Sequence, residues 1–206
     1  MTAPALAAAF AAGGYAEAFV VWAAARSGAR AIDVPIVRFR WWYGAAGALV
    51  ALYAGALGAW SPGAGASAAA LVAAFACALT DARSGYVFDR ALLVGAIPVV
   101  ALGAGGVPMR AEGAVAIGAL FAAPYLLSRG RGFGLGDVKL GALLGAGLGI
   151  GGGLSMFAAS FIAGAVFGLI ALATKRLDRK AAIPFAPFIA LGGAIGYAFP
   201  LRWPPG

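Results

Sequence analysis

Two aspartates lie at the ends of long apolar segments, where a carboxylate is costly unless it is paired, hydrated or functional. Asp81 closes the segment "ACALTD", and Asp137 stands in the stretch "GLGDVKL" that opens another. If helices place both at the same depth of a bundle, the two carboxylates cannot both ionise easily, and one keeps a proton near neutral pH. The ionised member can then take a proton from water while the protonated member donates to a carbonyl oxygen, as in aspartic proteases. The alternative is that Asp137 only caps the N-terminus of its helix.

Three glycines precede Asp137 at alternate positions, Gly132, Gly134 and Gly136. Glycine gives the backbone access to positive φ and leaves room for another chain to come close. We therefore expect this loop to admit an extended peptide beside the carboxylate. A phosphate-binding loop fits less well, because the third glycine of G-x-G-x-x-G would fall on Asp137 and no strand precedes the loop.

The remaining acidic residues carry weaker signals. We expect each to be a loop charge, an ion-pair partner or a helix cap. They are Glu17, Asp33, Asp89, Glu112 and Asp178. Glu17 is the most costly of them to bury, because it lies inside an apolar run. The sequence suggests no role for it.

The composition is that of an integral membrane protein. The 206 residues are 63% hydrophobic and 11% charged, against roughly 45–50% apolar and 25% charged in soluble domains. The net charge of +8 lies in short clusters between apolar runs rather than on a soluble basic face, which argues against nucleic-acid binding. With one cysteine, Cys77, and no histidine, the chain cannot build a cysteine-based zinc site, and we expect no metal or other cofactor.

The apolar runs predict an all-α membrane bundle of eight transmembrane helices in one domain, residues 1–206. A run of about 20 residues is enough to span the hydrocarbon core. The predicted helices cover residues 3–25, 41–60, 65–80, 91–107, 113–128, 138–152, 154–174 and 183–201. Among them, Gly141, Gly145 and Gly149 recur every four residues and predict one helical face for close packing.

The positive charges orient this bundle, because short cytoplasmic loops collect Lys and Arg. With the N-terminus outside, the cytoplasmic segments are 26–40, 81–90, 129–139 and 175–182. They hold thirteen of the fifteen positive residues, and the other two are Arg110 and Arg202. We therefore expect both termini outside and both aspartates at the cytoplasmic edge of the inner (cytoplasmic) membrane.

Three motifs, in the same order along the chain, resemble those of the type IV prepilin peptidases, membrane aspartyl proteases of the GxGD class. The first in the chain, "LTDARSGYVFDRALL", is similar to the family's first-aspartate segment. "GLGDVKL" is similar to its G-x-G-D-x-K-L stretch, and "IPFAPFIALGG" to its last-helix I-P-F-G-P-F motif. The eight-helix layout extends the likeness over nearly the whole chain.

By this resemblance Asp81 and Asp137 are the catalytic pair. Further residues would frame the site or contact the substrate: Gly134, Gly136, Lys139, Pro184, Phe185 and Pro187. The implied substrates are prepilin or pseudopilin precursors, cut between a short basic leader and the hydrophobic helix that follows. Since the leader and the cytoplasmic face of the enzyme are both basic, we expect anionic membrane lipids to hold them together.

The chain departs from the family pattern at two places and in one loop. Val87 and Phe88 stand where the family usually has Ile-Pro, and Ala186 replaces the glycine of the last-helix motif. Residues 26–40 contain no cysteine, whereas longer members carry paired C-x-x-C motifs there that hold zinc, and those enzymes also N-methylate the product. We expect a peptidase with this cytoplasmic loop shortened and without N-methyltransferase activity.

A proton- or cation-coupled small transporter is the main alternative, because membrane carboxylates mark transporters as well. Transporters usually bind substrate near the midplane between repeated halves, and this chain has no visible repeat. Presenilin and signal peptide peptidase also use two aspartates, but Asp81 follows Thr80 here and not the tyrosine of those proteins. A scaffold without activity would have no reason to keep both aspartates.

Overall fold

The computed structural model describes residues 2–29, 39–58, 60, 62–130, 133–175 and 183–202, and over these residues the regular structure is helical. The α-helices are α1 (Ala3–Ala29), α2 (Trp41–Leu57), α3 (Pro62–Ser84), α4 (Asp89–Leu102), α5 (Val107–Ser128), α6 (Leu135–Ala173) and α7 (Ala186–Ala198). A short 3₁₀ helix, η1 (Ala104–Gly106), joins α4 to α5. The all-α prediction is confirmed for the described part of the chain. Gly132, Asp33, Asp178 and most of the 26–40 loop lie outside it.

Four helices are long and apolar enough to cross a membrane. The spans are Ala3–Gly28, Gly63–Ser84, Val107–Ser128 and Leu135–Ala173, and the helices Trp41–Leu57 and Ala186–Ala198 are apolar but shorter. These helices support a membrane protein, while the number of eight spans and the side of the termini stay predictions. The predicted start of the fifth helix at residue 113 is wrong: α5 begins at Val107, so Arg110 and Glu112 lie in its first turns and not in an outer loop.

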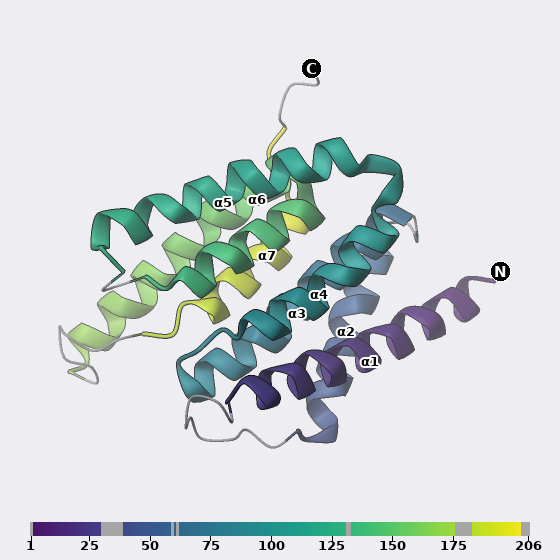
Figure 1. The fold of residues 1–206 in the computed structure, drawn as a ribbon, viewed down its shortest axis with the longest axis horizontal. Helices are drawn as coiled ribbons and strands as arrows, with labels where there is room; N and C mark the ends of the chain where they lie inside the picture. The colour runs from purple at the N-terminus through teal and green to yellow at the C-terminus, as the bar shows by residue number, and fades with distance from the viewer. Residues whose placement is uncertain are drawn as a thin grey trace.

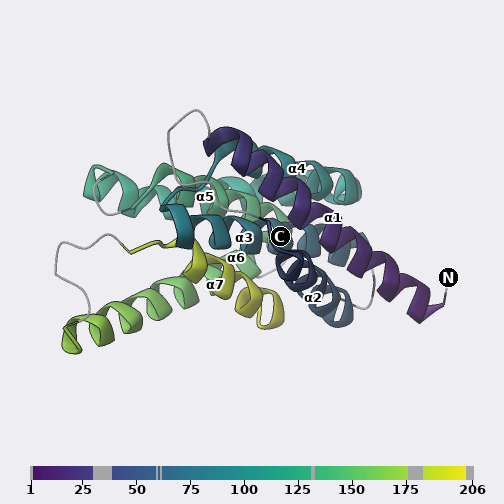
Figure 2. The ribbon, with the colours of Figure 1, turned by 90° about the horizontal axis from the view of Figure 1, so that it is seen from below.

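Helix α3 is the centre of the bundle. It packs against α1, α2, α4, α6 and α7, and Figure 2 shows it between α1 and α4 on one side and α2 and α7 on the other. Its buried side chains are mostly alanine. Small side chains let neighbouring helices pack closely, which matters in a membrane because the hydrophobic effect does not drive helices together there. Asp81 lies on this helix, about one turn before its end.

Helix α6 reverses direction at Gly149, where φ is 70° and ψ is −178°. The side chain of Ile117 packs against both Gly145 and Gly153, and the ring of Phe121 packs against both Gly141 and Phe157. In a straight helix these pairs would be about 12 Å and 24 Å apart, so the two halves of α6 must run side by side. The predicted division into two segments is thus confirmed, but its position is wrong: the turn is at Gly149, inside the predicted run 138–152. Gly149 is therefore not part of one packing face with Gly141 and Gly145.

The turn in α6 leaves backbone carbonyls without their helical partners, and two side chains supply donors. The Arg110 guanidinium donates to the carbonyl oxygen of Ala146 at 3.1 Å, and the Ser67 hydroxyl donates to that of Gly147 at 2.7 Å. Because lipid offers no hydrogen bonds, such carbonyls must be satisfied within the protein. Arg110, expected as an outer loop charge, instead helps to stabilise this turn. Figure 1 shows α5 and α6 together on one side of the bundle.

Replacing Gly149 should destabilise the protein through its backbone alone. An added Cβ meets nothing within 4 Å, but the conformation at φ 70° and ψ −178° is essentially restricted to glycine and costs other residues about 1–3 kcal/mol. We expect Gly149→Ala to lower the thermal unfolding midpoint of the purified protein in detergent.

The matched control is Gly13→Ala, in the middle of α1, where an added Cβ also meets nothing within 4 Å. Gly13 has no positive φ, so this variant should unfold at the same or a higher temperature, since alanine favours helix. Equal midpoints for the two variants would contradict the strained turn.

Candidate active site

Asp81 is a buried carboxylate held by the start of another helix. Its side chain is 5% exposed, and its Oδ2 accepts a hydrogen bond from the backbone N–H of Ala186 at 3.1 Å. Ala186 is the first residue of α7, so this N–H has no partner within its own helix. The start of a helix also carries partial positive charge. The last-helix motif therefore supplies a donor that favours the charged form of Asp81.

Asp137 is held in a similar way by the start of its own helix. It is the third residue of α6 and 8% exposed, and its Oδ2 accepts the backbone N–H of Gly134 at 3.1 Å. Gly134 is the N-cap residue of α6, so Asp137 provides one half of a capping box. The capping alternative is thus partly realised, but it occupies only one carboxylate oxygen.

The two carboxylates lie at the same end of the bundle, because the loops beside them are in contact: Gly136 faces Val87, and Phe133 packs against Phe185. Each uses Oδ2 for a backbone N–H, and neither Oδ1 accepts a hydrogen bond from the described residues. A water molecule between the two Oδ1 atoms would have a base on one side and an acid on the other. The arrangement therefore fits acid–base hydrolysis.

An aromatic contact links the two loops that hold the carboxylates. Phe133 precedes Gly134, Phe185 precedes Ala186, and the two rings lie 5.1 Å apart at an interplanar angle of 64°. Phe161, from the second half of α6, packs against both rings. These contacts fix the two N–H donors relative to each other. Phe133 was missed in the sequence, because an aromatic residue inside a glycine-rich loop gives no periodic signal.

The last-helix motif forms the start of α7. Phe185 is the residue that precedes the helix, and Pro187 lies in its first turn, where a missing N–H costs nothing. Pro184 lies just before them, in residues 183–185, which have no regular secondary structure. The predicted residues of this motif are therefore next to Asp81, and Ala186 contacts it through its backbone.

The glycines before Asp137 do not act as expected. The positive φ values among the described glycines are at Gly85, Gly130 and Gly149, so the expectation of positive φ is wrong for Gly134 and Gly136. Gly136 instead faces Val87, and a Cβ at Gly136 would lie 2.8 Å from the Val87 Cβ. The absent side chain lets the Asp137 loop pack against the loop that follows Asp81.

Lys139 forms an ion pair with Asp89. Its Nζ lies 2.6 Å from Asp89 Oδ1, and the two side chains are 42% and 64% exposed. The pair joins the start of α4 to the second turn of α6, so Lys139 is directed to Asp89 and not to Asp137. This confirms the ion-pair expectation for Asp89. An exposed pair contributes little to stability, about 0–1 kcal/mol.

Comparison with known proteins adds the family. Residues 68–169, which include both aspartates, match the type IV leader peptidase family. Over this region the chain belongs to the type IV leader peptidase family. No solved structure matches the chain significantly.

The curated relatives that this chain matches are named prepilin leader peptidase/N-methyltransferase. The one from Bacillus subtilis is 38% identical over 84 residues, which are 41% of this chain and 34% of that protein. The one from Xanthomonas campestris is 44% identical over 62 residues, 30% of this chain and 22% of that protein. The one from Burkholderia pseudomallei is 39% identical over 71 residues, which are 34% of this chain and 23% of that protein. The chain thus spans about a third or less of the length of the relatives it matches.

A double-mutant cycle can test the contact between the two aspartate loops. Gly136→Ala places a Cβ against the β-branched Val87, and we expect a loss of about 1–3 kcal/mol in stability from overpacking. Val87→Gly removes the obstructing side chain, so Gly136→Ala should cost less in that background. Thermal unfolding of the four proteins measures the coupling; strictly additive losses would show that the loops do not touch here.

Proposed function

We propose that this chain is a membrane aspartic endopeptidase that removes the short basic leader from type IV prepilin-like precursors. The observation that carries the proposal is the pair of buried carboxylates, each tied through Oδ2 to a backbone N–H at a helix start and each with Oδ1 unengaged among the described residues. The family match spans both residues, and the curated relatives are named as prepilin leader peptidases.

The proposed mechanism needs only the two carboxylates and water. The ionised carboxylate takes a proton from water as its oxygen attacks the scissile carbonyl carbon, and the protonated carboxylate donates to the carbonyl oxygen. The tetrahedral intermediate then collapses: the ionised carboxylate takes a proton from one of its hydroxyl groups, the C–N bond breaks, and the protonated carboxyl group donates its proton to the leaving nitrogen. The pair then again shares one proton. The helix-start N–H groups stabilise whichever carboxylate carries the charge.

The proposed orientation puts this site at the cytoplasmic edge of the inner membrane. Arg83, Arg90, Arg129, Lys139 and Lys175 lie at the helix ends next to the aspartates, and Arg110 lies at the other end, beside the α6 turn. This distribution supports the orientation, since cytoplasmic ends collect positive charge. A precursor that crosses the membrane with its leader in the cytoplasm would present the scissile bond at this depth.

Cleavage of a co-expressed prepilin should require both carboxylates. We expect Asp81→Asn and Asp137→Asn each to slow leader removal by at least about a hundredfold, because an amide cannot exchange the catalytic proton. Mobility of the precursor on gels and mass spectrometry of the new N-terminus give the readout in isolated membranes.

The matched control is Glu112→Gln, the same kind of charge removal at an exposed position in the first turns of α5. It should cleave like the unmodified protein. If the aspartate variants insert normally and still cleave, the pair is not catalytic. Loss of a proton or cation flux with cleavage intact would favour the transporter alternative, for which the family match gives no support.

We also propose that the chain lacks N-methyltransferase activity. Support comes from the cysteine-free 26–40 segment and from Cys77, the single cysteine, which is fully buried in α3. With a prepilin substrate and S-adenosylmethionine, the product N-terminus should have the mass of the unmethylated peptide. A product heavier by one methyl group, absent without the purified protein, would refute this proposal.

A further inference from the structure

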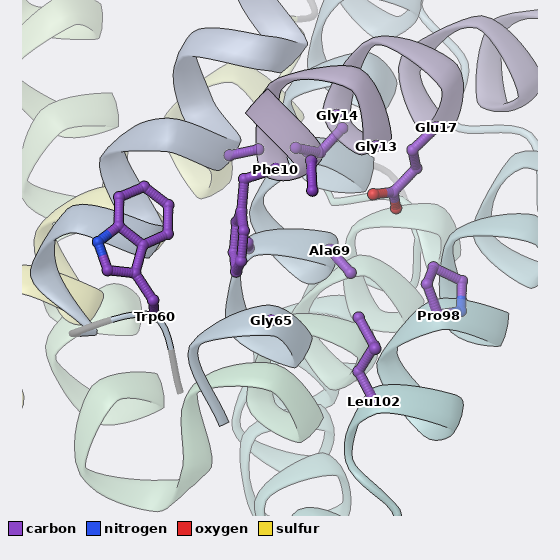
Figure 3. Close-up of a pocket in the computed structure, with 13 residues that line it drawn as sticks. Phe10, Gly13, Gly14, Glu17, Trp60, Gly65, Ala69, Pro98 and Leu102 are labelled. Carbon is purple, nitrogen blue, oxygen red and sulfur yellow. The ribbon is translucent and has the colours of Figure 1, made fainter. Parts of the chain in front are cut away.

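A second pocket lies away from the aspartate pair and contains Glu17. It has a volume of about 470 Å³ and is lined by residues of α1, α2, α3 and α4, among them Phe10, Gly13, Ala69 and Pro98. Figure 3 shows the Glu17 carboxylate directed into this space. Ala69 and Asp81 are separated along α3 by about 18 Å, so the pocket is distinct from the candidate active site.

Glu17 Oε1 is the unusual atom in this pocket. It is buried and has no hydrogen-bond partner among the described residues. The ion pair between Lys139 and Asp89 lies elsewhere in the bundle and does not involve it. Glu17 lies in the middle of α1, far from either end of a membrane span. A buried carboxyl oxygen without a partner costs free energy. Because Glu17 lines the pocket, a turn about its last side-chain bond would bring this oxygen to a donor on a bound molecule.

The rest of the pocket suits an apolar body. Its wall is built from glycine and alanine residues, from Val72, Pro98 and Leu102, and from the rings of Phe10 and Trp60, which meet edge to face at 5.0 Å. An added Cβ at Gly13 would meet nothing within 4 Å, which shows that this side of α1 borders open space. A volume of this size is typical of sites for small organic ligands, about 300–1,000 Å³.

We propose that this pocket binds a single-chain amphiphile whose terminal hydroxyl donates a hydrogen bond to the Glu17 carboxyl group while its hydrocarbon chain lies against the apolar wall. A phospholipid headgroup fits poorly, because it stays at the membrane interface and Glu17 is at mid-helix. A cationic amine fits less well than a hydroxyl, since taking an ammonium ion into an apolar site carries a large desolvation penalty.

Photoaffinity labelling of the full chain in phosphatidylcholine nanodiscs tests this site. Two probes of equal length carry the same photoreactive diazirine: a long-chain alcohol and its methyl-terminated analogue. We expect the alcohol to label peptides of α1, α3 and α4 that line the pocket about tenfold more than the analogue does, the difference that one hydrogen bond to a carboxyl group would give. Peptide mass spectrometry reads the labelled positions.

Variants at Glu17 separate the hydrogen bond from mere solubility in the pocket. Glu17→Leu should reduce labelling by the alcohol to the level of the analogue. Glu17→Gln keeps an acceptor oxygen of the same shape and should retain most of the labelling. Because the readout is labelling and not cleavage, it does not depend on the proposed peptidase activity.

A variant that fills the pocket provides an independent test. Gly13→Leu fills the open space without meeting other atoms at its Cβ and should block labelling, whereas Ala12→Leu, on the same helix but not in the pocket wall, should not. Equal labelling by the two probes, or labelling that survives both Glu17→Leu and Gly13→Leu, would overturn the proposal.

Discussion

The hydrogen bonds from helix-start N–H groups to the two aspartates are the interactions on which the arrangement of this end of the bundle depends. A carboxylate in an apolar bundle needs donors, and helix starts offer backbone N–H groups that no other residue uses. Asp81 takes such a donor from α7 and Asp137 takes one from the N-cap of α6. The bond from Ala186 brings the end of α3 to the start of α7, and the aromatic contact of Phe133 with Phe185 brings the start of α6 to the same place.

This convergence is possible only because α6 turns back at Gly149. If α6 were straight, Phe161 would lie about 39 Å from Leu135 at its start, whereas its ring packs against Phe133, two residues before that start. The turn returns the chain to the aspartate end before α7 begins. The donors from Arg110 and Ser67 to the freed carbonyls make the turn tolerable inside the membrane.

Much of this architecture could be predicted from the sequence, because it depends on patterns of neighbouring residues. Apolar runs gave the helices and the division of α6, and acidic residues at the ends of those runs pointed to Asp81 and Asp137. The contacts between distant segments could not be predicted. Gly136 against Val87, Lys139 with Asp89, and Phe133 against Phe185 each join loops far apart in the chain, and neither spacing nor propensity specifies such pairs. Arg110 was misplaced because a charged residue in an apolar chain suggests a loop, whereas here backbone carbonyls supply its partners.

The donors to both aspartates belong to the main chain, and this affects how the site responds to mutation. A side-chain donor is lost when its residue is replaced, but the N–H groups of Gly134 and Ala186 remain whatever side chain stands there, with the exception of proline. The environment of the carboxylates is thus insulated from most single substitutions at the donor positions. It can be adjusted chiefly by moving the backbone, which depends on the residues packed around the two loops.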